Sequence, residues 1–176
     1  DQWPSLSRYV LLFLMMIGAC AGSTGGGMKV SRFLLSVKSA LRELNSYLFP
    51  KSVKKIKMDG KTVDEEAIRG INVYFTAYIL LVVLSVFLIC INGMDIESAF
   101  SSVLGTFNNI GPGLGKFGPT CNFGWVSTFS KYVYIFDMLA GRLELFPVLI
   151  LLYPPSWRGL LKRSMKRKKN KRATTI

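Results

Sequence analysis

The stretch whose residue types best suit a chemical role runs from Thr106 to Gly115 and reads Thr-Phe-Asn-Asn-Ile-Gly-Pro-Gly-Leu-Gly. It lies between two apolar runs that are each long enough to cross a bilayer, but it is itself too polar and too rich in glycine and proline to do so. Glycine lets a backbone turn its carbonyl oxygens inward, and partly dehydrated K⁺ needs a ring of such oxygens. Our hypothesis is that this stretch forms one quarter of a potassium-selectivity filter.

A second glycine-rich stretch interrupts the first apolar run, which extends from Leu6 to about Met28. Residues 18–27 read Gly-Ala-Cys-Ala-Gly-Ser-Thr-Gly-Gly-Gly and are weakly helical at best, since each interior glycine costs up to about 1 kcal/mol. Broken backbone at membrane depth persists only where protein buries it or where it lines a water-filled cavity. We therefore interpret residues 22–27, the glycine loop, as a candidate gate; a close helix-packing face of small residues is the alternative.

The glycine loop also has the G-x-x-x-x-G spacing of a phosphate-binding loop. Met28 follows it, however, where such a loop requires lysine, and no strand precedes it. We reject that interpretation.

A charged cluster marks the last apolar run, which extends from Lys131 to Tyr153 and contains Asp137, Arg142 and Glu144. Arg142 lies about midway, where a charge costs several kcal/mol unless it faces a bundle interior or a water-filled cavity. Because Arg142 and Glu144 are two residues apart, they do not face each other on a helix, which disfavours a local ion pair. We predict a cavity-facing Arg142, and a bend at Pro147 is compatible with this run.

Composition narrows the class of protein. Half of the 176 residues are hydrophobic and the formal net charge is +13, which is typical of a membrane protein with basic cytosolic segments rather than of a nucleic-acid-binding domain. The chain has no histidine and three cysteines without a CxxC pair, so neither a zinc site nor a Ser-His-Asp or Cys-His nucleophile is supported. We expect no enzyme activity.

Two further elements must position these residues. Ile71 to Ile91 is free of charge and matches the length needed to span a bilayer. Asp95 to Phe107 is a short helix candidate that suits either a re-entrant pore helix or an amphipathic helix at the membrane surface, and its spacing does not decide between them. A re-entrant helix would direct the negative end of its dipole toward a cation.

The segment from Lys29 to Arg69 is polar and basic. Residues 30–44 have helical apolar spacing, with one face made of Phe33, Leu34, Val37, Leu41 and Leu44. Pro50 interrupts this helix, Asp59-Gly60 predicts a hairpin over about residues 53–63, and Asp64-Glu-Glu66 predicts the start of the next helix.

Charge predicts the topology. Residues 29–69 hold ten Lys and Arg and the tail 158–172 holds nine, whereas Lys116 stands alone between the second and third crossings. The positive-inside rule places residues 29–69 and the C-terminus in the cytosol, and residues 92–130 and the N-terminus outside. The tail either touches anionic lipid or serves only as an orientation signal.

Three motifs, at residues 18–29, 108–115 and 141–147, occur in the order and with the separations seen in the Trk/Ktr/HKT potassium transporters. The chain resembles the C-terminal part of this family, especially the bacterial Trk type, over nearly its whole length. Family members carry four membrane–pore–membrane repeats around one pore. The resemblance implies that this chain is a fragment, as does its start at Asp1; trimming of a mature N-terminus is the alternative.

The implied fold is an all-α integral membrane protein, in which one broken membrane helix precedes a membrane helix–pore helix–membrane helix repeat with a re-entrant filter loop. Residues 1–50 match the second membrane helix of the third repeat, with its intramembrane loop and cytosolic extension. Residues 51–69 form a cytosolic hairpin and linker, residues 70–154 the fourth repeat, and residues 155–176 a basic cytosolic tail.

The resemblance also implies roles for particular residues. The filter strand falls on Asn109, Ile110, Gly111 and Pro112, with K⁺ held by the backbone carbonyls of the first three. The glycine loop matches the family's intramembrane gating loop, and Arg142 matches the basic residue beside it. The loop residues are Gly22, Ser23, Thr24, Gly25, Gly26 and Gly27.

The implied activity is potassium uptake through a gated, channel-like pore in the plasma or inner membrane, with K⁺ as the transported ion and no bound cofactor. The implied partners are a second copy of the full-length protein, a cytosolic nucleotide-binding regulatory subunit and the lipid bilayer, with no nucleic acid. Two alternatives remain open: a carrier for another small solute, with the solute at the broken helix, and a non-transporting membrane anchor or assembly subunit.

Overall fold

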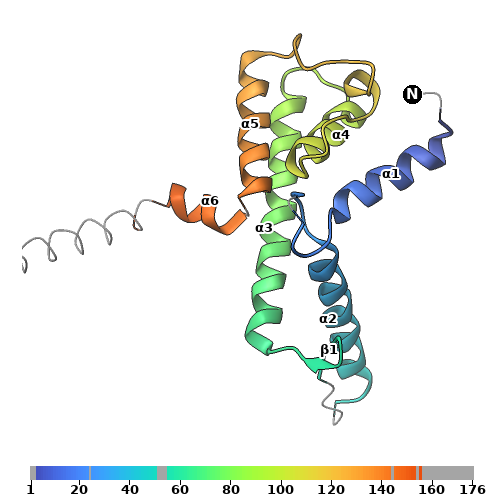
Figure 1. Cartoon of the computed structure of the whole chain (residues 1–176), viewed down its shortest axis with the longest axis vertical. Coiled ribbons are helices and arrows are strands. Elements are labelled where there is room, and N and C mark those ends of the chain that lie inside the picture. Colours follow the sequence, from blue (N-terminus) through green and yellow to red (C-terminus); the bar gives the residue numbers. More distant parts are fainter. Residues whose placement is uncertain (1–2, 24, 51–54, 144, 154, 156–176) are drawn as a thin grey trace, which may run out of the picture.

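The computed structural model describes residues 3–23, 25–50, 55–143, 145–153 and 155. Within them the regular secondary structure is helical apart from one small hairpin (Figure 1). The elements in chain order are α1 (Ser5–Ile17), α2 (Val30–Leu48), β1 (Lys57–Met58), β2 (Lys61–Thr62), α3 (Glu65–Cys90), α4 (Ile96–Phe107), the 3₁₀ turn η1 (Gly115–Phe117), α5 (Thr128–Arg142) and α6 (Leu145–Leu152).

The long helix α3 is the axis against which α2, α4, α5 and α6 pack. Its 26 residues extend about 39 Å, enough to cross a hydrocarbon core of about 30 Å. It begins after Asp64, and its first turn carries Glu65 and Glu66, where the positive end of the helix dipole favours acids. The predicted helix start is confirmed. Among the described residues, α3 is the one helix both long and apolar enough to span a membrane.

The first apolar run is broken, as predicted. Helix α1 ends at Ile17 because Gly18 adopts a φ of +77°, outside the helical region. The described residues between Gly18 and Lys29 form neither helix nor strand. The amide of Val30 donates to the carbonyl of Ala19 at 3.0 Å, which closes the interruption into a compact loop before α2 begins.

The last apolar run, predicted as one crossing over residues 131–153 with a bend compatible with Pro147, is also broken. Helix α5 ends at Arg142 and α6 begins at Leu145, so Arg142 ends a helix instead of lying inside one. The break falls before Pro147, the third residue of α6. Proline lacks an amide hydrogen, and its ring would collide with the carbonyl four residues earlier, that of Leu143, in a continuous helix. In Figure 1, α6 turns away from the line of α5.

Helix α4 confirms the short helix predicted over residues 95–107. The carboxylate of Asp95 accepts from the amide of Ser98 at 3.0 Å and caps its first turn. Helix α4 packs against both α3 and α5 and ends near the middle of α3 (Figure 1). Nine of its twelve residues are buried, which favours the re-entrant helix over the surface helix.

The segment around the hairpin has a small hydrophobic cluster of its own. Leu35 on α2, Ile56 before the hairpin and Ile68 on α3 make a separate small cluster. Asp59 and Gly60 both have positive φ, as a two-residue hairpin turn requires. This confirms the turn; the predicted residues 53 and 54 lie outside the described part of the chain. The predicted apolar face of α2 is exposed at Leu34, Val37, Leu41 and Leu44.

Candidate functional site

Backbone hydrogen bonds hold the segment 109–112 directly against α4. After Phe107 the chain reverses, and the amides of Ile110 and Gly111 both donate to the carbonyl of Gly105, at 2.9 and 3.2 Å. The reversal requires positive φ at two positions, +55° at Asn109 and +105° at Gly111. Asparagine tolerates the left-handed region better than most residues, and glycine enters it freely.

Two buried serines on α4 hold the continuation of this segment. The Ser101 hydroxyl accepts from the amide of Leu114 at 2.9 Å, and the Ser98 hydroxyl accepts from the amide of Lys116 at 3.2 Å. Because the two serines are three residues apart, they lie on one face of the helix. Our sequence reasoning missed both, although small hydroxyl residues on the buried face of a short apolar helix are a usable signal.

The carbonyl oxygens of the segment 109–112 differ in their surroundings. Those of Gly111 and Pro112 lie 3.1 and 3.3 Å from the position that a Cβ on Gly105 would occupy, so they lie close to α4. Glycine at position 105 is therefore what lets the segment approach the helix. The Ile110 side chain is about half exposed, and a Cβ on Gly111 would meet no described atom within 4 Å.

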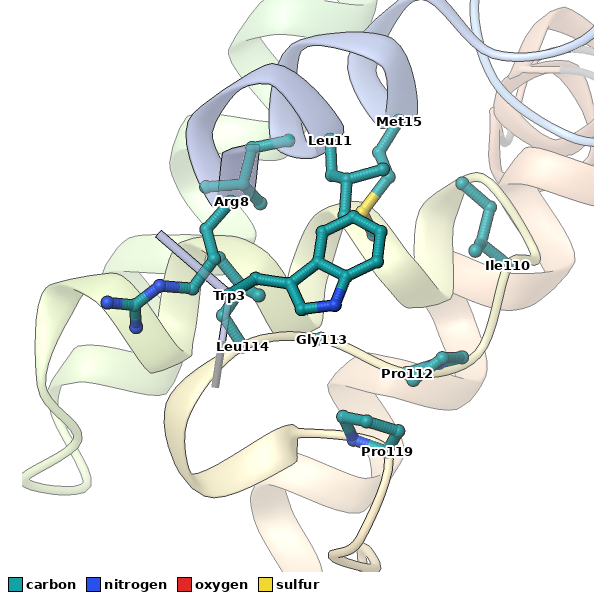
Figure 2. Close-up of a pocket in the computed structure, with 10 residues that line it drawn as sticks. Trp3, Arg8, Leu11, Met15, Ile110, Pro112, Gly113, Leu114 and Pro119 are labelled. Carbon is teal, nitrogen blue, oxygen red and sulfur yellow. The ribbon is translucent and has the colours of Figure 1, made fainter. Parts of the chain in front are cut away.

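An apolar cavity of about 410 Å³ borders the other side of this segment. Figure 2 shows Trp3, Leu11 and Met15 facing Ile110 and Pro112 across it. Arg8 also lines the cavity, and its guanidinium lies 3.8 Å from the carboxylate of Glu97 on α4. The cavity is thus lined by both α1 and the segment 109–112.

The glycine loop lies against the end of α4. The amide of Gly26 donates to the carbonyl of Asn108 at 3.2 Å. A Cβ on Gly26 would lie 2.8 Å from the carbonyl oxygen of Phe107, and a Cβ on Gly27 would lie 1.8 Å from the side-chain oxygen of Asn108. Only glycine fits both positions, and at Gly27 the φ of +88° adds a backbone requirement.

The remaining loop residues are less enclosed. Gly22 and Ser23 are exposed and Gly25 is half-buried, with its amide donating to the Ser23 hydroxyl at 3.2 Å. Thr24 lies outside the described residues. The loop therefore has a docked end at Gly26 and Gly27 and an open end at Gly22 and Ser23.

Helix α5 approaches the same point. A Cβ on Gly141 would lie only 1.7 Å from the carbonyl oxygen of Phe107, and the side-chain amide of Asn109 donates to the carbonyl of Met138 at 3.3 Å. Arg142 follows Gly141 directly and is exposed. The last turn of α4 thus meets the glycine loop, the segment 109–112 and the end of α5.

Two tyrosines of α3 complete this junction, and our sequence reasoning missed them because they lie within an apolar span. The Tyr74 hydroxyl donates to the carbonyl of Gly27 at 3.1 Å, and the Tyr78 hydroxyl donates to the side-chain oxygen of Asn108 at 3.3 Å. Both tyrosines are buried. A hydroxyl within an otherwise apolar span is the signal that could have found them.

Charges gather at the two ends of α3. At its N-terminal end, a hydrogen bond from Arg42 lowers the pKa of Glu65, and the same contact raises the pKa of Arg42. Beyond its C-terminal end, hydrogen bonds from Ser98 lower the pKa of Asp95, which also lies 3.6 Å from the Lys116 ammonium. In the described part of the chain, no group of three or more His, Cys, Asp or Glu side chains could hold a metal.

Known proteins match most of the chain. A family model named TrkH and described as "Cation transport protein" matches residues 1–157. The Trk system potassium uptake protein TrkH of Vibrio parahaemolyticus is 45% identical over 158 residues, which cover 90% of this chain and 32% of that protein. The protein of the same name in Escherichia coli K12 is 41% identical over 157 residues, covering 89% of this chain and 32% of that protein.

A solved structure agrees with the fold. The crystal structure of the potassium transporter TrkH from Vibrio parahaemolyticus matches with a TM-score of 0.79 at 44% identity, covering 88% of this chain and 33% of that one. The predicted all-α membrane transporter fold is confirmed by this match. The chain spans about a third of the length of the relatives it matches.

Proposed function

Because this chain belongs to the TrkH family of cation transport proteins, we propose that it is part of a gated, channel-like potassium uptake transporter. In this proposal it supplies one of four filter strands and the loop that closes the pore. No chemical step is involved, since K⁺ moves down its electrochemical gradient. The named activity of its relatives, potassium uptake, supports the proposal.

One observation favours this function over the alternative functions. The glycine loop is hydrogen-bonded to the base of the segment 109–112, through the amide of Gly26 and the carbonyl of Asn108. A filter strand with a flexible obstruction bound directly beneath it is the arrangement that a gated pore needs. A simple membrane anchor has no use for such a contact.

We assign the selectivity filter to Asn109, Ile110, Gly111 and Pro112, with K⁺ coordinated by the carbonyl oxygens of the first three. Rings of backbone carbonyls replace the hydration shell of a K⁺ ion in such filters. The negative end of the α4 dipole lies at the base of this segment and favours a cation there. The cavity of about 410 Å³ beside the segment provides room for filter strands from other repeats.

The glycine loop acts as the gate and Arg142 as an electrostatic barrier beside it. Gly141 places Arg142 within one residue of the contact with Phe107, close to the base of the filter. A positive charge at this point opposes the passage of cations until the loop and the arginine rearrange.

Charge and the arrangement of the helices support one topology. The hairpin and the loop that follows α4 lie at opposite ends of α3 (Figure 1). We place residues 29–69 and the C-terminus in the cytosol and the N-terminus of this chain outside. Residues 1–50 then form the second membrane helix of the third repeat, residues 70–154 the fourth repeat, and residues 51–69 and 155–176 cytosolic segments.

The full-length protein acts as a homodimer with a cytosolic nucleotide-binding regulatory subunit in this proposal. The basic segment 29–69 and the basic tail are the surfaces available to such a subunit on the cytosolic side. The ion pair of Arg42 with Glu65 joins α2 to α3 there, so a force applied to the cytosolic end of α2 is shared with α3.

The test is growth and uptake in cells that lack potassium transport. We expect the full-length protein that contains this chain, supplied with its regulatory subunit, to restore growth and ⁸⁶Rb⁺ uptake at low external K⁺. A well-expressed protein that restores neither would contradict the proposal. Uptake of another solute without dependence on K⁺ would instead indicate a carrier.

A further inference from the structure

Tyr74 and Tyr78 form a pair one helical turn apart on the inner face of α3. Residues four apart on a helix share one face, and both side chains are buried against the end of α4 and the glycine loop. A tyrosine in an apolar environment normally requires a partner for its hydroxyl. The partners here are two different parts of the candidate pore.

Tyr74 connects three elements. Its hydroxyl donates to the carbonyl of Gly27 at 3.1 Å, and Gly27 is the residue by which the glycine loop docks. The guanidinium carbon of Arg32, in the first turn of α2, lies 4.3 Å from the centre of its ring. The loop and the helix that follows it are thus both in contact with one side chain of α3.

Tyr78 contacts the base of the segment 109–112 instead. Its hydroxyl donates to the side-chain oxygen of Asn108 at 3.3 Å, and its ring packs edge-on against Phe107 with the centroids 5.1 Å apart. The other end of the Asn108 amide donates to the carbonyl of Leu104 at 2.9 Å. Tyr78 therefore fixes the rotamer of Asn108 at the base of the segment 109–112.

We propose that these tyrosines are positioning residues with separate tasks: Tyr74 holds the glycine loop in its docked position, and Tyr78 holds the base of the filter. The proposal rests on the function proposed above. Helix α3 is long and regular, so it provides a fixed reference for a loop that glycine leaves conformationally free. Two hydroxyls one turn apart on α3 fix the position of the glycine loop relative to the filter along the axis of this helix.

The two tasks predict different consequences for ion flux. Tyr74→Phe keeps the ring and removes one hydrogen bond that exists only while the loop is docked, so the open state becomes more populated. Opening affects all permeant cations equally, and the ratio of Na⁺ to K⁺ flux stays as it is. Tyr78→Phe frees the Asn108 side chain beneath Asn109, so this ratio changes.

The experiment uses the full-length protein reconstituted into liposomes without the regulatory subunit. K⁺ and Na⁺ fluxes are measured for the wild type, Tyr74→Phe, Tyr78→Phe and the control Tyr47→Phe. Tyr47 lies at the exposed end of α2 and undergoes the same chemical change. We expect Tyr74→Phe to raise both fluxes by the same factor, about two- to tenfold, as the loss of one hydrogen bond implies. Tyr78→Phe raises the Na⁺/K⁺ flux ratio, and Tyr47→Phe changes neither quantity.

The outcomes separate this inference from the function on which it rests. A wild-type protein that passes no K⁺, either here or with its regulatory subunit, contradicts the proposed function. A conducting wild type with an unchanged Tyr74→Phe variant overturns the gate assignment alone. Failure of Tyr74→Phe to fold would also overturn it, because the hydroxyl would then be structural. An unchanged flux ratio in Tyr78→Phe overturns the assignment of the filter base.

Discussion

Gly141→Ala tests the packing of α5 on the end of α4, where the structure is least tolerant. A Cβ at this position would lie 1.7 Å from the carbonyl oxygen of Phe107 and 2.8 Å from its carbonyl carbon. Both are backbone atoms, so no side-chain rotation relieves the clash. Since ordinary contacts begin at 3.4 Å, α5 has to separate from α4 by about 1.7 Å.

The expected cost follows from two opposing effects. Overpacking typically destabilises by about 1–3 kcal/mol, and a clash with rigid backbone belongs near the upper end of that range. In the opposite direction, alanine in place of glycine inside a helix stabilises the fold by about 1 kcal/mol. We expect a net loss of about 1–2 kcal/mol for Gly141→Ala.

Two other helical glycines provide matched variants. A Cβ on Gly70 in α3 would meet no described atom within 4 Å, so Gly70→Ala should gain helix stability without a steric clash. At Gly105 a Cβ would lie 3.1 Å from the carbonyl oxygen of Gly111, which needs to move only a few tenths of an ångström. We expect Gly105→Ala to leave stability nearly unchanged but to displace the segment 109–112 and weaken discrimination between K⁺ and Na⁺.

The assay is the apparent melting temperature of each full-length variant in detergent, at one heating rate because such unfolding is often irreversible. We expect Gly70→Ala to melt at or above the wild type and Gly141→Ala clearly below it. Equal melting temperatures for Gly141→Ala and Gly70→Ala would refute the packing that brings α5 against Phe107.

Two further predictions concern charged residues. Arg142→Ala should raise basal K⁺ flux in liposomes because it removes a positive charge beside the candidate pore, and equal or lower flux would count against an electrostatic barrier. Hydrogen bonds from Ser98 lower the pKa of Asp95 in the folded state below its unfolded value of 3.8. The ionised carboxylate therefore stabilises the fold above pH 3.8, and this stabilisation is lost as the pH falls through the pKa of the folded state. Asp95→Asn keeps a side chain that can cap the helix but cannot ionise. We therefore expect the melting temperature of the variant to fall less than that of the wild type between about pH 5 and pH 3. An identical pH profile for variant and wild type would contradict the role of the carboxylate.

Local chemistry made several elements predictable. The run of glycines after Ile17 disfavours helix wherever it is placed, so the broken first crossing follows from sequence alone. Asp95 and the turn pair Asp59-Gly60 act through their nearest neighbours, so the start of α4 and the position of the hairpin turn were equally accessible.

The contacts between distant parts of the chain were not predictable in this way. The hydrogen bond between Gly26 and Asn108 joins residues 82 positions apart, and no periodicity or propensity encodes it. Tyr74 and Tyr78 look like ordinary members of an apolar span until the partners of their hydroxyls are known. The bend allowed for at Pro147 is present, but it falls between Arg142 and Leu145, because proline disturbs a helix as far as four residues before its own position.

The most direct test of the central claim is the ion selectivity of Gly111→Ser in liposomes containing the full-length protein. The matched control is Gly93→Ser, since both glycines have positive φ, at +105° and +77°, and a Cβ on either would meet no described atom within 4 Å. A side chain at Gly111 strains this φ and rotates the adjacent carbonyls, so we predict a loss of preference for K⁺ over Na⁺ in Gly111→Ser alone. Unchanged discrimination in Gly111→Ser, or an equal loss in Gly93→Ser, would contradict the assignment of the filter.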